Sequence, residues 1–307
     1  MSAPHRSPLS HAEPPPTRGD RIRAALHRAL PTQALTWAVR PIAHSRRPWL
    51  KNRLNTLFAR RYGLELGEAE ATSPTAYPSL NALFTRALRP GARPLPKDPN
   101  TLAGPCDGTI SAIGDLDGDG LLQAKGVTYS ATELLAGLHG DEFRDGAYLT
   151  TYLAPQDYHR IHAPLNARLV ASRHVPGRLL TVGASTVRAV PRLYLRNERL
   201  VTLWQTAVGP MAIVLVGATN VGTIETTWEG PTGNPPGIER QYGRDGPYLL
   251  RGDELGRFNL GSTVVLLLPR DALVWSPLLR PGRRIRTGEP LGALRATGDA
   301  LKALPQA

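Results

Sequence analysis

The sequence of 307 residues contains a single cysteine, Cys106. One cysteine excludes an intramolecular disulfide framework and any zinc or iron–sulfur site built from several cysteines. The chain also has no apolar run that approaches the roughly 18 residues of a membrane-spanning helix, and residues 1–20 lack the apolar stretch of a signal peptide. We therefore expect neither a spanning helix nor an exported protein.

Acidic residues are scarce at the front of the chain. Residues 1–61 hold twelve lysines and arginines but only two acids, and so carry ten of the twelve net positive charges. The partner that this charge attracts, an anionic membrane or a nucleic acid, should therefore meet the front of the chain rather than the nearly neutral remainder. The composition, with 41 % hydrophobic and 20 % charged residues, is that of a folded protein of one large or two modest domains.

Residues 1–19 are rich in proline and are predicted to be a disordered tail, whereas the pattern after them is helical. Apolar residues recur at helical spacing over residues 20–30, 35–42, 49–62 and 79–88. Arginines stand beside apolar stripes that carry Trp49 and Phe58, which is typical of helices that lie in a membrane interface. Residues 20–91 are thus predicted to form a basic, amphipathic, membrane-associating region.

Two other interpretations of this basic region remain open. Its helices could pack their apolar stripes on the core of the protein and leave a solvated basic face. Nucleic-acid binding is disfavoured, because bare helices with so few aromatic residues offer little for bases to stack on.

The residue pattern changes near residue 92 from helical spacing to short β-rich runs that are separated by glycine and proline turns. The run TVVLLL at residues 263–268 is continuously apolar and predicts a strand that is buried on both faces. Further strands are predicted over residues 147–153, 166–175 and 284–294, and on both sides of turns at Gly209 and Gly217. The predicted fold class is α+β, with a mainly antiparallel β body over residues 92–307.

Three short segments contain residues suited to chemistry. His159 and His162 share the segment YHRIH, which we expect to be a loop after a strand, and without a third ligand nearby they suit acid–base work better than metal binding. Asp107 stands in a proline–glycine turn, and Ser262 follows a glycine at the entrance to the TVVLLL run. Taken singly, each of these residues could simply stabilise a turn.

Taken together, the segments resemble one family. The matching pieces are LNALFTRALRPGARPL (80–95), the turn at 106–108, LLQAKGVTYS (121–130), TTYLAPQDYHRIHAP (150–164), VPGRL (175–179), RNER (196–199), VGATNVGTIETTW (216–228) and GDELGRFNLGST (252–263). They occur in the order found in the bacterial phosphatidylserine decarboxylases, pyruvoyl-dependent enzymes that mature by cutting their own chain. One departure is Cys106, which stands where the family pattern has a small residue such as alanine or valine.

The resemblance implies a self-cleavage triad of Asp107, His162 and Ser262. Asp107 would hold His162 in the correct tautomer, His162 would take the proton of the Ser262 hydroxyl, and the resulting alkoxide would attack the carbonyl of Gly261. The chain would be cut between Gly261 and Ser262 into a large chain, 1–261, and a small chain, 262–307. Ser262 would become a pyruvoyl group.

The implied activity is decarboxylation of phosphatidylserine to phosphatidylethanolamine in phospholipid biosynthesis. The amino group of the substrate would condense with the pyruvoyl ketone, so that the enzyme would need neither pyridoxal phosphate nor a metal. His159 would donate the proton that replaces the lost carboxyl group. Tyr152 and Phe84 are candidates for lining the pocket around the serine headgroup.

The same resemblance implies partners and a location. Phosphatidylserine in an anionic membrane is the expected partner, the two chains of one precursor would form a heterodimer, a higher homo-oligomer stays open, and no nucleic acid is expected. We expect a peripheral membrane protein on the cytoplasmic face of the cell membrane. Two other classes remain as alternatives: a Ser/His/Asp hydrolase, although the usual GxSxG motif is absent here, and a noncatalytic β-rich adaptor on a membrane.

Overall fold

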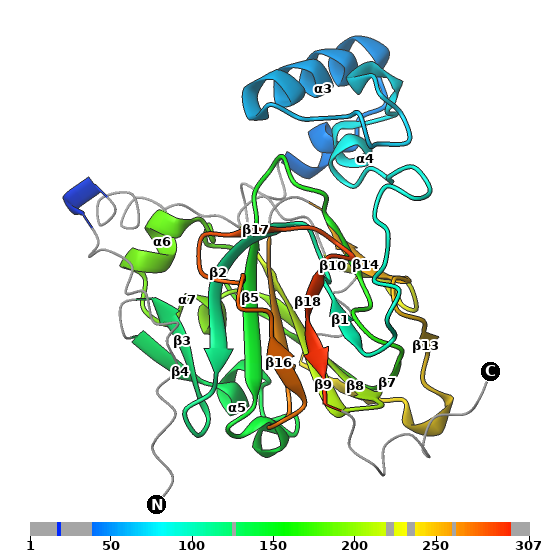
Figure 1. Ribbon diagram of the computed structural model, residues 1–307. Helices are drawn as coiled ribbons and strands as arrows, with labels where there is room; N and C mark the ends of the chain where they lie inside the picture. The colour runs from blue at the N-terminus through cyan, green and yellow to red at the C-terminus, as the bar shows by residue number, and fades with distance from the viewer. Residues whose placement is uncertain are drawn as a thin grey trace, which may run out of the picture.

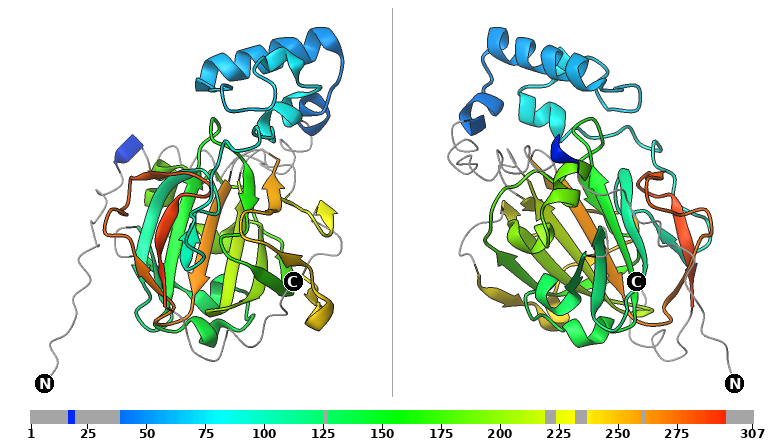
Figure 2. Two further views of the ribbon diagram at one scale, coloured as in Figure 1. Left: turned by 45° about the vertical axis from the view of Figure 1, so that its right-hand side comes forward. Right: turned by 90° about the vertical axis from the view of Figure 1, so that its left-hand side faces the viewer.

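The computed structural model describes residues 17–19, 39–124, 127–218, 224–231, 237–259 and 262–295. Most of the predicted proline-rich tail, the predicted helix over residues 20–30 and the predicted cleavage residue Gly261 lie outside the described residues. A β body forms the larger part of the molecule, and a small helical region stands over one end of it (Figures 1 and 2).

A nine-stranded sheet forms the centre of the β body, and its strands pair antiparallel. In spatial order they are β12 (Glu239–Gln241), β7 (Ala167–Val175), β8 (Arg199–Thr206), β9 (Gly209–Gly217), β15 (Ser262–Leu268), β5 (Ala147–Leu153), β2 (Gly108–Asp115) and β17 (Arg284–Ile285), with β13 (Tyr248–Leu249) also on β7. The predicted antiparallel β body is confirmed, and so is the α+β class. The strands predicted over 147–153, 166–175 and 263–268 are β5, β7 and β15.

Smaller sheets and short helices cover the nine-stranded sheet. The four-stranded sheet consists of β11 (Gly230–Pro231), β10 (Ile224–Thr226), β14 (Glu254–Phe258) and β6 (Arg160–His162), the three-stranded sheet of β1 (Thr101–Ala103), β18 (Pro290–Leu294) and β16 (Leu273–Trp275), and a hairpin of β3 (Gly120–Ala124) and β4 (Val127–Ser130). The helices of the body are α5 (Ala131–Leu134), η2 (Gly140–Phe143), α6 (Ala184–Ala189), α7 (Leu193–Arg196) and η3 (Gly243–Asp245).

The hydrophobic core lies on both faces of β15. Val265 and Leu267 pack in a cluster with α5, α6, α7 and the β3–β4 hairpin, whereas Val264 and Leu266 pack in a second cluster with the two smaller sheets. All seven residues of β15 are buried. Successive side chains of a strand point to opposite faces of the sheet. Because each face of β15 packs in its own hydrophobic cluster, the run has to be apolar on both faces.

The helical region contains α3 (Pro48–Tyr62), η1 (Pro74–Ala76) and α4 (Leu80–Phe84). Pro48 stands at the first position of α3, and Gly63 ends the helix in the left-handed conformation that glycine adopts without strain, so the helix predicted over residues 49–62 is confirmed. Asn55 is the fully buried residue of α3, and its side chain donates to the carbonyl oxygens of Pro74 and Tyr77 at 2.9 and 3.3 Å.

Only part of the apolar stripe of α3 is packed: Phe58 contacts a small cluster that contains Tyr77 and Leu83, whereas other apolar side chains of the stripe are exposed. Trp49 and Leu57 are 64 % and 66 % exposed, and the exposed Arg53 and Arg60 lie on the same shallow groove. Within the described part of the chain, no helix combines the length and the apolar character needed to cross a membrane. The exposed apolar and basic side chains on α3 therefore make it a candidate for contact with a surface.

Two sequence predictions need correction. The helix predicted to reach Leu88 ends at Phe84, because residues 87–89 pair with residues 68–70 instead of continuing the helix. The predicted N-cap, Ser79, is correct, since its hydroxyl oxygen accepts from Ala82 N at 3.1 Å. His162 lies in the short strand β6 rather than in a loop, because residues 160–162 pair with β14.

Candidate active site

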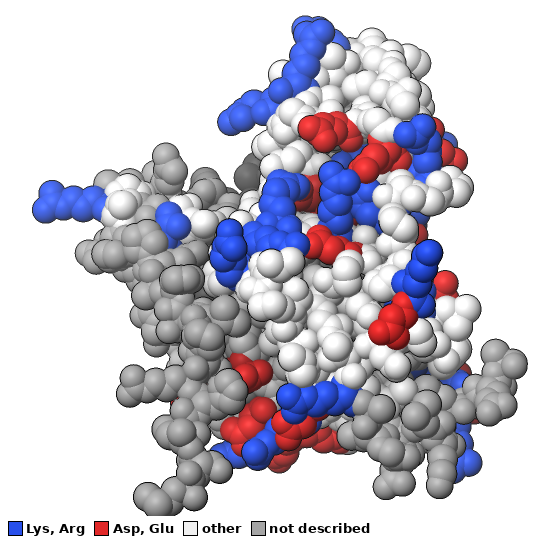
Figure 3. Space-filling view, in the orientation of Figure 1, with Lys and Arg blue, Asp and Glu red and all other residues white. Residues whose placement is uncertain are grey.

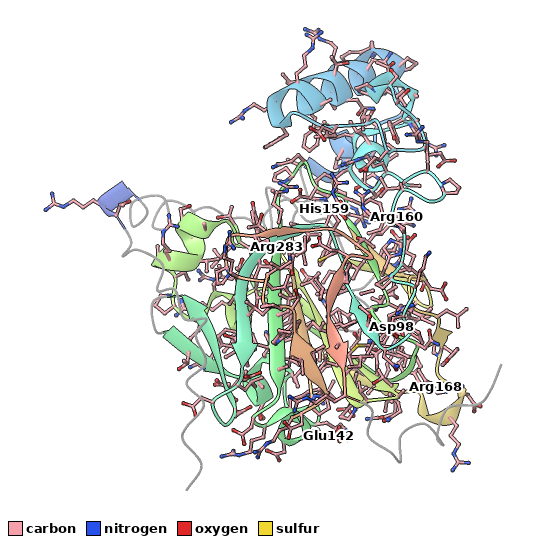
Figure 4. All side chains as sticks on the ribbon, viewed as in Figure 1. Asp98, Glu142, His159, Arg160, Arg168 and Arg283 are labelled. Carbon is pink, nitrogen blue, oxygen red and sulfur yellow. The ribbon has the colours of Figure 1, made fainter. Side chains whose placement is uncertain are left out.

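Three strand ends bring the candidate residues to one end of the β body. Ser262 begins β15 opposite Leu153, the last residue of β5. Asp107 immediately precedes β2, the neighbour of β5 on its other side. His162 lies next to the Asp107 turn, because its backbone N–H donates to the carbonyl oxygen of Pro105 at 2.8 Å. Figure 4 shows that this end, marked by His159 and Arg160, faces the helical region.

Ser262 is fully buried, and its hydroxyl has no hydrogen-bond partner among the described residues. A buried hydroxyl without a partner costs free energy, of the order of 1–3 kcal/mol. The hydroxyl faces the core that contains Leu153, since directly opposed residues of an antiparallel pair share one face of the sheet. Thr150, Thr151 and Thr263 also have buried hydroxyls without a partner in the described part of the chain, so what distinguishes Ser262 is its place at the start of a central strand, next to the strand that Asp107 precedes.

Asp107 is held by an arginine from the helical side of the molecule. Arg93 donates from Nε to Asp107 Oδ1 at 3.1 Å and from Nη2 to Oδ2 at 2.6 Å, and the backbone N–H of Thr287 donates to Oδ1 at 2.8 Å. Arg93 also pairs with Glu68 at 2.8 Å. The carboxyl group is therefore fixed in orientation, but its hydrogen bonds do not go to His162.

His162 is fixed by two other groups. Its Nδ1 lies 2.7 Å from the carbonyl oxygen of Gly252, and its Nε2 lies 2.9 Å from the hydroxyl of Tyr158. Because a carbonyl oxygen can only accept, Nδ1 carries the hydrogen and Nε2 accepts the Tyr158 hydroxyl proton. Burial lowers the pKa of His162, so that its imidazole is neutral at neutral pH. A carbonyl thus sets the tautomer that the sequence had led us to expect from Asp107.

His159 is fully buried against the helical region. Its Nδ1 donates to the carbonyl oxygen of Asp157 at 2.9 Å, and its Nε2 has no partner among the described residues. The ring of Phe84 lies 4.0 Å from the imidazole, centroid to centroid. Burial lowers the pKa of His159 to about 3, with a smaller contribution from Arg86. His159 is therefore neutral and holds a free lone pair on Nε2.

The two pocket candidates lie in different places. Phe84 is buried on His159, as described above, and so lies at the site. Tyr152 precedes Leu153 on β5 and lies opposite Thr263, so its side chain is on the other face of the sheet from Ser262. There it packs beside the cluster that contains Val265.

A charged cavity of about 350 Å³ separates the helical region from the strand ends, and we call it the junction cavity. It is lined by Gly63, Glu65, Glu68, Arg86, Leu88, Arg93, Asp107, Gln156, Asp157, Tyr158, Arg284 and Arg286. Figure 3 shows basic and acidic side chains interleaved in this zone. No cluster of three or more side chains suited to holding a metal ion occurs among the described residues.

Sequence reasoning missed the groups that hold the candidate residues. Arg93 and Tyr158 both lie inside segments that the sequence singled out, but their partners, Asp107 and His162, could be assigned only from the fold. The carbonyl of Gly252 leaves no signal at all, because any residue type supplies a carbonyl. Arg86 could have been noticed as a charge within an apolar helical pattern, next to Phe84.

A buried hydroxyl, two neutral imidazoles and a fixed carboxylate at adjacent strand ends are groups of the kind with which enzymes carry out nucleophilic and acid–base chemistry. Comparison with known families identifies which enzyme class this is. Residues 80–293 match the phosphatidylserine decarboxylase family, and residues 22–63 match a second family description, PSD.

Curated relatives agree with this match. The chain is 61 % identical over 277 residues to the phosphatidylserine decarboxylase proenzyme of Halorhodospira halophila, covering 90 % of this chain and 95 % of that protein. It is 48 % identical to the proenzyme of Alkalilimnicola ehrlichii over 83 % of this chain and 91 % of that one, and 46 % identical to that of Marinobacter nauticus over 80 % and 88 %. The chain belongs to the phosphatidylserine decarboxylase family.

Proposed function

We propose that this chain is a proenzyme that cuts itself between Gly261 and Ser262 and then decarboxylates phosphatidylserine to phosphatidylethanolamine. The observation that carries the proposal is the buried Ser262 hydroxyl without a partner at the start of β15. Membership of a family whose curated relatives are called proenzymes supports it. A pyruvoyl group made from Ser262 would be the cofactor, and an unengaged serine at this strand end fits its precursor.

In the first step, Nε2 of His162 takes the proton of the Ser262 hydroxyl. The Tyr158 hydroxyl occupies that nitrogen in the structure and has to leave it before the transfer. Nδ1 of His162 keeps its hydrogen and donates it to the carbonyl oxygen of Gly252, so the lone pair stays on Nε2, the nitrogen that accepts the serine proton. The charge of Asp107 favours the imidazolium that forms, and acts through space because its hydrogen bonds go to Arg93 and Thr287.

The Ser262 oxygen then attacks the carbonyl carbon of Gly261, and the peptide bond becomes an ester as the nitrogen of Ser262 leaves with the proton. Removal of the Ser262 α-proton expels the Gly261 carboxylate by β-elimination. Hydrolysis of the remaining dehydroalanine releases ammonia and leaves a ketone on the new N-terminus of the small chain. We assign the base in both proton removals to His162.

Once formed, a pyruvoyl group supplies a ketone that accepts electrons as carbon dioxide leaves. We assign to His159 the proton transfer of the decarboxylation step. Its Nε2 delivers a proton to the substrate Cα after carbon dioxide has left. A pKa of about 3 makes the imidazolium a strong acid that is suited to donation, and the proton comes from solvent, because decarboxylation consumes one proton overall. Phe84 lines this place, whereas Tyr152 would reach the substrate only after residues at the start of β15 move.

We further propose that the protein is peripheral to the cytoplasmic face of the cell membrane, where α3 meets anionic lipid. The exposed Trp49 and Leu57, with the exposed Arg53 and Arg60 beside them, support this placement. The large and small chains would stay together as a heterodimer, and residues 20–91 would form the membrane-associating part.

The experiment is to compare wild type, Ser262→Ala and Ser262→Cys by denaturing gel and by release of carbon dioxide from phosphatidylserine in mixed micelles. We expect wild type to give two chains and carbon dioxide, Ser262→Ala to stay whole and inactive, and Ser262→Cys to cut slowly if at all. A fully active polypeptide that remains uncut would refute the proposal.

A further inference from the structure

Arginines dominate the basic side of the junction cavity, and three of the four have carboxylate partners. Arg93 pairs with Glu68 and Asp107, Arg284 pairs with Asp157, and Arg286 pairs with Glu68 at 3.0 Å. Within the part of the chain that the structure describes, the fourth, Arg86, pairs with no carboxylate. Arg86 is thus the arginine of the cavity without a direct carboxylate partner, although the charges of Asp107 and Asp157 act on it through space.

The surroundings of Arg86 leave its guanidinium incompletely bonded. The residue is only 5 % exposed, and its Nη2 donates to the carbonyl oxygens of Gln156 and Asp157 at 2.8 and 3.2 Å. Its Nε and Nη1 are buried without an acceptor among the described residues. Arginine remains charged even when buried, so this arrangement is costly unless another group supplies acceptor oxygens.

Arg86 lies beside the residues assigned to decarboxylation. Two residues earlier in the chain, Phe84 packs on His159, and between them Thr85 accepts at its carbonyl oxygen from Arg160 Nε at 3.0 Å. Three consecutive residues thus contact the segment of residues 156–160. A ligand bound at Arg86 would lie next to this segment and within the electrostatic reach of His159.

We propose that Arg86 binds the phosphodiester of the phosphatidylserine headgroup in the junction cavity. This assignment rests on the proposed function and adds the residue that holds the substrate's phosphate. A guanidinium donates charge-assisted hydrogen bonds to phosphate oxygens, and Nε and Nη1 of Arg86 lack acceptors among the described residues. These two nitrogens lie on opposite edges of the guanidinium, so each would donate singly, and a two-bond fork to one phosphate would need Nη2 to leave a carbonyl.

The change of charge during the reaction favours the phosphodiester, rather than the serine carboxylate, as the group that Arg86 binds. The carboxylate loses its charge as carbon dioxide leaves, so an ion pair with it would stabilise the substrate more than the transition state and slow the reaction. The phosphodiester keeps its charge throughout. Arg86 can therefore hold it equally in substrate and transition state, which is uniform binding and affects KM rather than kcat.

The first test measures binding without catalysis, on uncut Ser262→Ala protein. Thermal unfolding is followed with glycerophosphoethanolamine, inorganic phosphate or L-serine at millimolar concentrations. We expect glycerophosphoethanolamine to raise Tm more than inorganic phosphate does, and L-serine to have no effect. The shift should vanish when Arg86→Gln is added and persist with Arg89→Gln, a matched change three residues later at an exposed arginine.

Three results would overturn the assignment. They are no shift with glycerophosphoethanolamine, an equal shift in Arg86→Gln, or a larger shift with inorganic phosphate or L-serine. The first of these needs no variant at Arg86, so the proposal stays falsifiable even if Arg86→Gln folds poorly.

The second test uses the self-cut enzyme with phosphatidylserine in mixed micelles. Arg86→Gln should still cut itself and should raise KM about 10- to 100-fold at nearly unchanged kcat, as expected for loss of a charge-assisted hydrogen bond. Arg86→Lys should fall between that variant and wild type, and Arg89→Gln should match wild type. A lower kcat with unchanged KM would assign Arg86 to holding the 156–160 segment instead, whereas loss of cutting in wild type would refute only the proposed function.

Discussion

At the scale of residues, two histidines three positions apart are held in different ways. His162 has both ring nitrogens bonded, one to a carbonyl and one to a hydroxyl, whereas His159 has one bonded and one free nitrogen. Both are neutral because burial disfavours the imidazolium. The difference lies in the partner of the Nε2 lone pair, which is absent among the described residues in buried His159 and is the Tyr158 hydroxyl in His162.

Substitution of each histidine should separate self-cleavage from decarboxylation. His162→Ala removes the base that acts on Ser262, so the chain should stay whole and inactive. His159→Ala should still cut but lose decarboxylation by about 10²- to 10⁴-fold, the usual contribution of a general acid–base group. Gel electrophoresis and carbon dioxide release on each variant measure the two steps. Normal cutting by His162→Ala, or normal turnover by His159→Ala, would show that the role given to that residue is wrong.

His159 should also make the fold sensitive to acid. Its pKa is about 3 when folded, against about 6.5 for an exposed imidazole, so the unfolded chain binds its proton first as pH falls. Its contribution to stability is complete above pH 6.5 and is lost as pH falls from there toward 3. The slope is at most about 1.4 kcal/mol per pH unit for one proton.

Urea unfolding of Ser262→Ala protein between pH 7 and 4 measures this slope on a single uncut chain. Adding His159→Asn should flatten it, since His162, whose pKa is lowered as well, remains in both proteins and cancels in the comparison. Identical slopes with and without His159→Asn would show that His159 is not buried as a neutral group.

At the scale of elements, the sequence predicted the helices and strands whose residue pattern is compatible with only one kind of surroundings in a folded protein. The run at 263–268 had to be β15, because a strand that is apolar on both faces can only lie between two cores. α3 was recognisable from its apolar spacing and from Gly63, whose left-handed conformation ends it. Asp107, His162 and Ser262 were assigned by family resemblance and then found at adjacent strand ends.

Elements that depend on distant partners were not predictable. β6 is a strand only because β14, about ninety residues later, pairs with it. α4 stops four residues short of its apolar pattern because residues 87–89 pair with residues 68–70, while the Arg86 side chain bonds to carbonyls of residues 156 and 157. For the same reason the sequence could not show that Arg93 takes the carboxylate of Asp107. Such contacts are fixed by tertiary packing and not by local propensity.

The exposed face of α3 should bind anionic vesicles. Full burial of a large apolar side chain contributes about 1.5–3 kcal/mol, so the double change Trp49→Ser and Leu57→Ser should lower vesicle binding at least 10-fold. Co-sedimentation with anionic and neutral vesicles measures it. Added salt should weaken binding to anionic vesicles without abolishing it, because salt screens Arg53 and Arg60 but not the apolar contacts.

The matched control for α3 is Val274→Ser, which changes an apolar side chain that is 47 % exposed on β16 of the β body. It should bind as wild type does. If Val274→Ser lost as much binding as the double change, or if wild type bound anionic and neutral vesicles equally, the membrane role of α3 would have to be abandoned.

At the scale of the whole molecule, the cut would fall at the start of the most enclosed strand. β15 pairs along its length with β5 and with β9, from Ser262 opposite Leu153 to Leu268 opposite Ala147 on one side. The rest of the small chain supplies β17 to the nine-stranded sheet and β16 and β18 to the three-stranded sheet. Breaking one peptide bond before β15 removes none of these pairings.

The cut enzyme should therefore behave as one particle under native conditions. Residues 264–268 stay buried on both faces of the sheet after the cut, and each contributes about 1.5–3 kcal/mol of burial. We expect the chains 1–261 and 262–307 to elute together in gel filtration, at the volume of uncut Ser262→Ala protein, and to separate only in denaturant. Intact-mass measurement of the native peak and of the denatured sample identifies both chains. Loss of the small chain from the native peak would mean that the sheet around β15 opens when the bond is cut, contrary to the pairing described here.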